Sequence, residues 1–137
     1  MAEAKKEEEM LGQMEIYRGL YNSLRRRIDI LSSALAELSM CTESLKTLKE
    51  VKQGTEMLVP MGGEAFIKAR LDSNEKVIVG LGADVFVEKT TDEAIATLSE
   101  RSGAIEKAIN EALARLRKIE ANIGALEQAI LEEGPKE

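Results

Sequence analysis

The sequence predicts an α-helical protein with a small β-module, in which two long helices pair as an antiparallel coiled-coil hairpin. Three observations predict this fold class. Apolar residues recur at alternating spacings of three and four near both ends of the chain, as in a coiled-coil seam. The stretch between them alternates with a period of two and contains turn residues, as β-strands do. Aromatic residues make up only 3% of the chain, whereas compact cores rely on them for buried area.

The first predicted helix spans about residues 8–53. One run of heptad positions forms its seam, with a threonine near the end. These positions are Met10, Met14, Tyr17, Tyr21, Leu24, Ile28, Leu31, Leu35, Leu38, Thr42 and Leu45. Gly54 is the expected stop, because glycine readily adopts the left-handed conformation that ends helices. The helix would be about 65–70 Å long, too long for the interior of a compact domain of this size.

The middle of the chain, residues 57–89, is predicted to form four short strands arranged as two β-hairpins. Turn residues separate the alternating segments: the first and third turns contain glycine, and the middle turn is Asp72-Ser73-Asn74-Glu75. About 33 residues bury too little surface to be stable alone, and apolar side chains fall on both strand faces. Pairing with strands of other subunits would cover those faces and hide the sheet edges. The predicted assembly residues are Leu58, Phe66, Ile67, Val77, Ile78, Val79, Val85, Phe86 and Val87.

The second predicted helix spans residues 91–133. Thr90 is the expected N-cap, with Glu93 reaching back to it, and Gly134-Pro135 is the expected end. Its seam also follows three-four spacing. The seam positions are Ile95, Leu98, Ser102, Ile105, Ile109, Ala112, Leu116, Ile119, Ile123, Leu126 and Ile130. Two helices of nearly equal length with a short connector favour antiparallel pairing along their whole length.

Composition argues against several classes of function. The chain has no His, one Cys and a net charge of −6. It therefore lacks the commonest general base and metal ligand, and its charge is unfavourable for nucleic acid. The charged N-terminus does not resemble a secretory signal, and no apolar run approaches the roughly 20 residues of a membrane span. We expect a cytoplasmic protein that is not an enzyme, with no cofactor, metal, nucleic-acid or membrane binding.

Four local motifs are better explained by structure than by chemistry. Gly80-Leu81-Gly82 lacks the third glycine of a dinucleotide loop, and Glu88 stands before Lys89-Thr90 where a phosphate loop needs glycine. Arg25-Arg26-Arg27 would fan around a helix surface as a solvated face. Cys41 beside the seam is expected to act as a small hydrophobe.

The paired ends of the two helices leave two interpretations open. In an antiparallel hairpin, the start of the first helix meets the end of the second. Apolar residues there are either ordinary seam residues or a binding surface, for which frayed helix ends and flexible Met are suited. The residues concerned are Met10, Leu11, Met14, Ile123, Leu126, Ile130 and Leu131.

The strand segments resemble those of prefoldin, specifically the archaeal α-type subunits. The similar segments are Leu58-Val59-Pro60-Met61-Gly62, Ala65-Phe66-Ile67-Lys68-Ala69, Val77-Ile78-Val79-Gly80-Leu81-Gly82 and Val87-Glu88-Lys89-Thr90. The succession of long helix, two hairpins and long helix is also similar, over nearly the whole chain. The resemblance implies a single domain over residues 1–137, and two hairpins favour the α over the β class.

The resemblance further implies a heterohexamer of two α-type and four β-type subunits, whose hairpins form β-barrels between subunits. It implies an ATP-independent holdase chaperone that holds unfolded clients at the coiled-coil tips and delivers them to a group II chaperonin. The seven apolar residues at the paired ends are then the implied client contacts. The alternative is a structural coiled-coil protein that forms a homo-oligomer or filament through its β-module.

Overall fold

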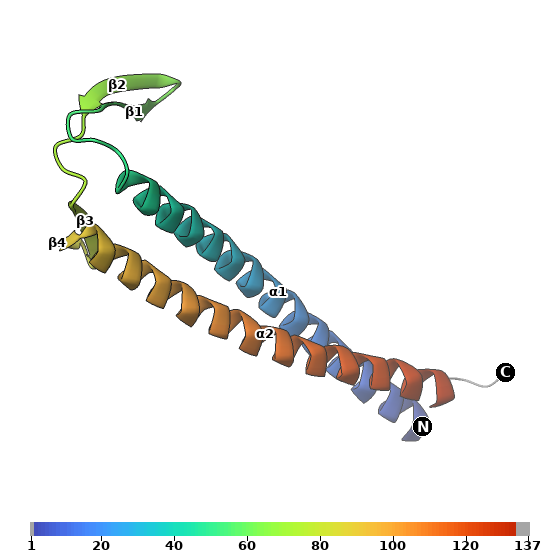
Figure 1. The fold of residues 1–137 in the computed structure, drawn as a ribbon. Helices are drawn as coiled ribbons and strands as arrows, with labels where there is room; N and C mark the ends of the chain where they lie inside the picture. The colour runs from blue at the N-terminus through green and yellow to red at the C-terminus, as the bar shows by residue number, and fades with distance from the viewer. Residues whose placement is uncertain (1, 134–137) are drawn as a thin grey trace. The chain divides into compact units, whose positions relative to one another are not determined.

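The computed structural model describes residues 2–133 and confirms the predicted fold class of two long helices and two β-hairpins. Figure 1 shows the order of the elements. They are α1 (Ala2–Leu48), β1 (Glu56–Gly62), β2 (Ala65–Arg70), β3 (Lys76–Gly82), β4 (Val85–Thr90) and α2 (Thr91–Glu133). The chain divides into two compact units, Met1–Leu35 with Ile105–Glu137 and Ala36–Ala104.

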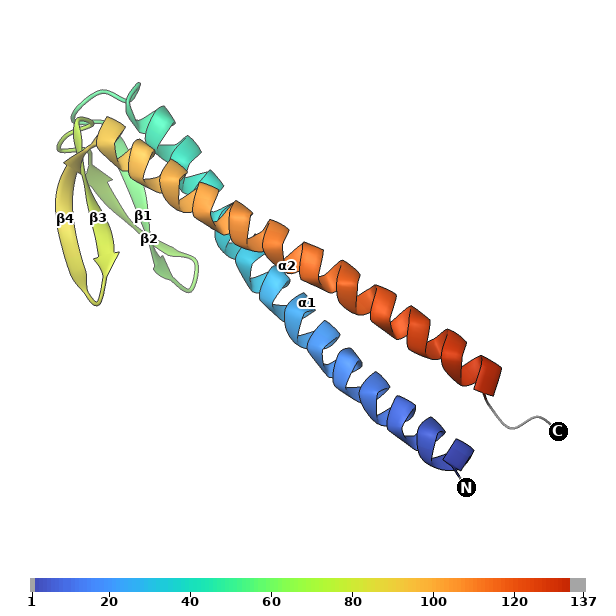
Figure 2. The ribbon, with the colours of Figure 1, turned by 90° about the horizontal axis from the view of Figure 1, so that it is seen from below.

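In the first unit, α1 and α2 run antiparallel side by side, as Figures 1 and 2 show. Their core consists of apolar residues at heptad positions of both helices: Leu24, Ile28, Ala112, Leu116 and Ile119. Tyr17, Tyr21 and Ile123 pack against this core. Every seam position predicted for either helix is buried or half-buried along the described chain. The three-four spacing therefore identifies the face that the helices bury.

Helix α1 differs from its predicted bounds of 8–53 at both ends. It begins at Ala2, because the segment Ala2–Glu7 consists of good helix formers. It ends at Leu48, well before Gly54. The reason lies in the segment between the hairpins, where the Asn74 side-chain nitrogen donates hydrogen bonds to the carbonyls of Lys49 (3.2 Å) and Val51 (2.9 Å). These bonds satisfy carbonyls that follow the last helical turn, so a distant side chain caps the helix end.

The four strands form two separate antiparallel sheets, β1 with β2 and β3 with β4. In the first hairpin Val59 lies opposite Ile67, and in the second Val79 lies opposite Val87. Each hairpin has one register shift just before its turn. The strands extend slightly beyond the predicted range 57–89, from Glu56 to Thr90.

Both hairpins turn through residues with positive φ. The φ angles are 95°, 58° and 64° along Gly62–Glu64, and 100°, 50° and 60° along Gly82–Asp84. Two central residues with positive φ match the type I′ geometry that favours the twist of paired strands. The first hairpin has glycine at its first central position, whereas the second has Ala83 there.

Helix α2 begins at Thr91, preceded by the predicted N-cap. The Thr90 hydroxyl accepts a hydrogen bond from the Glu93 backbone N–H at 3.1 Å. The Thr91 hydroxyl donates to the Asn74 carbonyl at 2.7 Å, and Lys49 Nζ lies 2.5 Å from an Asp92 carboxylate oxygen. Asn74 is thus linked to the end of α1 and the start of α2. The predicted stop at Gly134-Pro135 lies outside the described residues.

Candidate functional site

The first candidate site lies where the start of α1 and the end of α2 come together in the first unit (Figure 1). A hollow of about 500 Å³ opens there, which we call the tip hollow. It is lined by apolar and charged residues: Leu11, Met14, Glu15, Arg18, Glu127, Ile130 and Leu131. The hollow thus brings together residues that are far apart in the sequence.

The seven residues predicted at the paired ends differ in their exposure. Leu11 is 49% exposed and Leu131 is 79% exposed, whereas Met14 is only 4% exposed. Met14 is therefore mainly a seam residue that forms the floor of the tip hollow. Met10, Ile123, Leu126 and Ile130 are half-buried. Of the seven, Leu11 and Leu131 offer the most apolar surface to a ligand.

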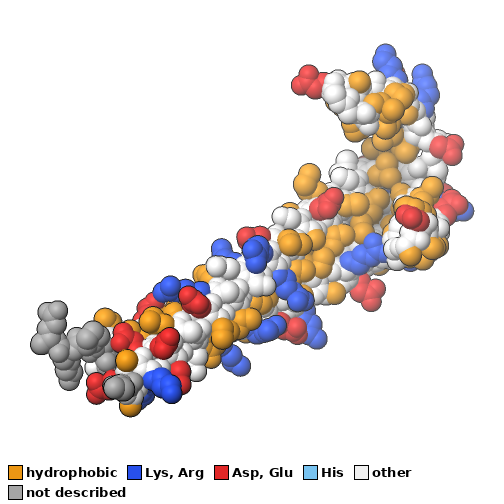
Figure 3. Space-filling view, turned by 180° about the vertical axis from the view of Figure 1, so that it is seen from behind, with side chains coloured by type: hydrophobic (Ala, Val, Ile, Leu, Met, Phe, Trp, Pro, Cys, Tyr) orange, Lys and Arg blue, Asp and Glu red, His pale blue; other side chains and the backbone are white. Residues whose placement is uncertain are grey.

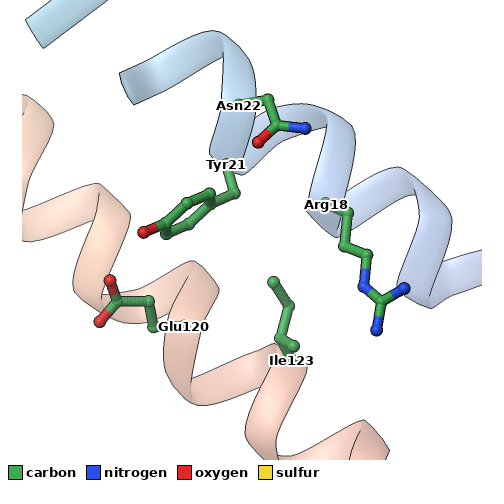
Figure 4. Close-up of a pocket in the computed structure, with 5 residues that line it drawn as sticks. All are labelled: Arg18, Tyr21, Asn22, Glu120 and Ile123. Atoms are coloured by element: carbon green, nitrogen blue, oxygen red, sulfur yellow. The ribbon is translucent and has the colours of Figure 1, made fainter. Parts of the chain in front are cut away.

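A second hollow of about 450 Å³ lies further along the same helix pair, and we call it the Tyr21 hollow. It is lined by Arg18, Tyr21, Asn22, Glu120 and Ile123 (Figure 4). Tyr21 and Ile123 point into the space between the helices, and Glu120 lies on α2 beside the Tyr21 ring. Arg18 lines both hollows, so they are adjacent.

The charged residues of the two hollows were not predicted as site residues from the sequence. Arg18, Glu120 and Glu127 look like ordinary solvated charges between seam positions. One signal could have found those on α1, because Leu11, Glu15, Arg18 and Asn22 are spaced by four, three and four. This spacing places them in one strip beside the seam.

The second candidate site is the surface of the two hairpins. Most of the predicted assembly residues are exposed, including Leu58, Phe66, Ile67, Val85 and Phe86, and Ile78 is 75% exposed. Figure 3 shows hydrophobic side chains on the surface of this region. Exposed apolar residues of this size are costly in water unless something covers them.

Three predicted assembly residues are less available than expected. Val79 is only 8% exposed, and Val77 and Val87 are half-buried. Val79 is therefore mainly a core residue of its own subunit. The sequence could not show this, because Val77-Ile78-Val79 has apolar residues on both faces of the strand. Conversely, Met61 and Leu81, which were not among the predicted assembly residues, are exposed.

Side chains of α2 hold the second hairpin in place within its unit. The Arg101 guanidinium donates a hydrogen bond to the Gly80 carbonyl at 2.7 Å. The Lys89 ammonium lies 3.2 Å from the Thr97 hydroxyl. Across the hairpin, a Cβ at Gly80 would lie 3.2 Å from the Phe86 ring, so the ring covers this glycine closely.

Metal binding and membrane spanning have little support in the part of the chain that the structure describes. No group of three or more His, Cys, Asp or Glu side chains among residues 2–133 is arranged to hold a metal ion. Within the same residues, neither helix has a stretch apolar enough to span a lipid bilayer. Cys41, predicted as a small hydrophobe beside the seam, is exposed.

Comparison with known proteins gives one consistent family. The profile of the prefoldin subunit family matches residues 17–135. The prefoldin subunit alpha of Methanopyrus kandleri is 35% identical over 123 residues, which cover 85% of this chain and 78% of that protein.

Two solved structures have a similar fold. Filamentous PFD from Methanocaldococcus jannaschii matches with a TM-score of 0.58 at 27% identity, covering 87% of this chain and 93% of that one. The prefoldin beta subunit of Thermococcus strain KS-1 matches with a TM-score of 0.61 at 17% identity, covering 96% and 95%. At that identity the second likeness concerns the fold alone.

Proposed function

Because this chain belongs to the prefoldin family of chaperone subunits, we propose that it is an α-type subunit of an ATP-independent holdase. In this proposal the paired helix ends bind unfolded proteins, and the assembled complex delivers them to a group II chaperonin. Unfolded proteins expose apolar surface, and covering it contributes roughly 25 cal/mol per Å². No nucleotide is needed when binding and release depend on such weak contacts alone.

The observation that carries the proposal is the tip hollow with its exposed Leu11 and Leu131. Apolar side chains left in water at the rim of an open hollow are typical of a surface that binds a partner. One such hollow contributes little binding energy. Several coiled coils in one assembly would raise the effective concentration of tips around a client and so increase avidity.

Assembly with β-type subunits, as two α and four β, is the second part of the proposal. It is supported by the two-stranded sheets, in which every strand has an unpaired edge. Free edges and exposed apolar faces are both covered when hairpins of several subunits join into a barrel. The exposed residues Phe66, Ile67 and Phe86 are proposed contacts between subunits, and Phe66 and Ile67 lie on opposite faces of β2.

The test is an aggregation assay with the assembled complex. A chemically denatured protein is diluted into buffer without nucleotide, and light scattering follows its aggregation. Replacing both Leu11 and Leu131 with Ser should raise the amount of complex needed for equal protection at least tenfold, because fully burying one Leu side chain contributes about 1.5–3 kcal/mol and about 1.4 kcal/mol corresponds to a factor of ten.

The matched control replaces two other exposed apolar residues of α1, Ile30 and Met40, with Ser. Neither residue lines the tip hollow. The control complex should protect as well as the wild type. Equal protection by the Leu11/Leu131 variant, with assembly intact by native mass spectrometry, would contradict the assignment of client binding to the tip.

A second candidate function is a structural filament, and one observation favours it. The solved relative from Methanocaldococcus jannaschii is filamentous and 27% identical to this chain. Heterologous pairing of exposed hairpins would give an open assembly rather than a closed ring. Electron microscopy of the chain alone and with β-type partners distinguishes the two: filaments in both samples favour this function, and closed particles of uniform mass favour the holdase.

A further inference from the structure

We infer that the tip hollow and the Tyr21 hollow form one groove that selects extended client segments in which basic residues flank apolar ones. The carboxylates of Glu15, Glu120 and Glu127 would make this selection. The inference rests on the proposed holdase function and adds the chemical class of client segment that the tip prefers.

The continuity of the groove follows from one shared residue and from helical spacing. Arg18 lines both hollows. On α1, Leu11, Glu15, Arg18 and Asn22 follow one another at helical spacing, so a single strip forms one wall.

The opposite wall belongs to α2. Leu131 and Glu127 line the tip hollow, and Glu120 lines the Tyr21 hollow. Gly124 occupies the position between Glu120 and Glu127 in the same strip. A Cβ at Gly124 would meet no atom within 4 Å, so this point of the wall is open.

The length of the groove indicates the conformation of the client. Leu11 and Asn22 are separated by about eleven helical positions, or about 17 Å along α1. An extended chain rises about 3.3 Å per residue, so about five residues would fill the groove. Unfolded proteins offer extended segments of this length throughout their sequence.

The floor of the groove is apolar and its rim is charged. Met14, Tyr21 and Ile123 are buried or half-buried between the helices and provide the floor. Figure 4 shows Arg18 directed away from the Tyr21 ring, toward the end of the helix pair. Three carboxylates and one guanidinium thus surround an apolar centre, and the rim has an excess of negative charge.

The α2 wall of the groove has the same sign of charge. The last described part of α2, residues 119–132, contains the acidic residues Glu120, Glu127 and Glu132 and no basic residue. Figure 3 shows both acidic and basic side chains near this end of the helix pair. A Lys or Arg in a bound segment therefore meets favourable charge, whereas an Asp or Glu meets like charge.

The existing ion pair does not neutralise the rim. Arg18 Nη2 lies 3.9 Å from Glu127 Oε1, and the two side chains are 62% and 57% exposed. An ion pair this long and this exposed contributes little, so a basic residue of the client can replace Arg18 beside Glu127. Glu127 is the carboxylate for which a client cation and Arg18 compete.

The experiment measures binding of dye-labelled peptides, about seven residues long to exceed the groove, by fluorescence anisotropy with the assembled complex. One peptide alternates Leu and Lys, and a second alternates Leu and Glu. At low salt the Lys peptide should bind more tightly, and the ratio of the two dissociation constants should shrink at high salt. Replacing Glu120 and Glu127 with Gln should lower that ratio about fivefold, within the usual range for two exposed charge pairs.

A matched control separates the groove from the general charge of the complex. Replacing Glu37 and Glu111 with Gln makes the same change in net charge, and these exposed residues line neither hollow. The control should keep the wild-type ratio. A loss of preference equal to that of the Glu120/Glu127 variant would overturn the inference, because long-range charge would then explain the preference.

Arg18→Gln should change the binding of the Lys peptide in the direction opposite to the Glu120/Glu127 variant. It removes the cation that competes for Glu127, so the Lys peptide should bind about twofold to threefold more tightly, a change within the range for one exposed pair. Weaker binding of the Lys peptide by this variant would contradict the competition.

Gly124→Phe should fill the open wall and weaken the binding of both peptides. Unchanged binding would show that the two hollows do not act as one groove.

The inference and the proposed function fail in different ways. Equal binding of both peptides by a wild-type complex that still suppresses aggregation would overturn the charge selection alone. A wild-type complex that binds neither peptide and suppresses no aggregation would overturn both.

Discussion

The two β-hairpins have nearly the same local plan but different surroundings. Both pair a strand of seven residues with a strand of six, and both have a register shift before a turn of positive φ. The second hairpin buries Val79 and accepts a hydrogen bond from Arg101 of α2. In the first hairpin every residue is exposed except Ala69, which is half-buried.

A hairpin sequence therefore defines its strands and its turn, but not the surface that they bury. Contacts with the helices decide which surface of a hairpin is buried. The second hairpin is attached to its own subunit, which leaves one face, with Ile78 and Phe86, exposed. The first hairpin keeps both faces exposed. If the hairpins mediate assembly as proposed, the first can be covered by partners on either face. The second offers mainly the face with Ile78 and Phe86, and on the other face it offers Val85 near the turn.

The largest expected effect comes from placing a charge in the corresponding cross-strand pair of each hairpin, Val59/Ile67 in the first and Val79/Val87 in the second. Val79→Asp should destabilise the subunit by about 3 kcal/mol or more, because it buries an unpaired carboxylate. Ile67→Asp should leave the subunit folded and prevent assembly. Circular dichroism during heating measures the first effect and native mass spectrometry the second. Equal loss of folding in both variants would contradict the difference between the hairpins.

The next effect concerns Asn74, in the segment that joins the hairpins. Asn74→Ala removes the hydrogen bonds to the Lys49 and Val51 carbonyls and should reduce the free energy of unfolding by about 2 kcal/mol. The rate of backbone amide hydrogen exchange should rise most at the end of α1. Ser73→Ala is the neighbouring control, since the Ser73 hydroxyl accepts a hydrogen bond from the nearby Glu75 backbone N–H at 3.1 Å rather than bonding the end of α1. A similar loss in the control would argue against a specific cap.

A smaller effect is expected for Arg101→Met, which keeps the length of the side chain and removes its hydrogen bond to the Gly80 carbonyl. A bond from a charged donor contributes about 1.5 kcal/mol. Hydrogen exchange should therefore become about tenfold faster in β3 and β4 and stay unchanged in β1 and β2. Faster exchange in both hairpins would show that Arg101 acts on the whole unit rather than on the second hairpin.

The smallest effects come from exchanging the turn residues. Ala83→Gly should stabilise the second hairpin by about 0.5–1 kcal/mol, because Ala at positive φ is strained. Gly63→Ala makes the reverse change in the first hairpin and should destabilise it by a similar amount. Thermal unfolding of the two single variants and of the double variant measures both changes in stability. Stability changes of the same sign in the two single variants would disprove the shared turn geometry.

The sequence predicted the fold better than the surfaces. The seam was fully predictable, since positions such as Leu24 and Leu116 repeat in a period that only a helix pair can bury. The end of α1 was not predictable, because Asn74 from a distant segment supplies its cap. Val79 was assigned to assembly because alternation alone cannot tell which strand face a helix covers.

The residues of the candidate site show the same limit. Leu11 and Leu131 were predictable as apolar residues at the paired ends. Arg18, Glu120 and Glu127 were not, since their importance depends on which side of the seam holds the hollows. Heptad spacing identifies the buried face and says little about the grooves beside it.

The link through Asn74 has a consequence for chemical ageing. Asparagine is among the residues lost during prolonged heating, because its side-chain amide hydrolyses. At this position hydrolysis would replace an NH₂ donor with a carboxylate facing the Lys49 and Val51 carbonyls. A mass increase of about one dalton at a single residue would thus turn two attractive contacts into repulsive ones. The lifetime of the folded subunit at high temperature would then depend on one amide group that takes no part in the proposed binding of clients.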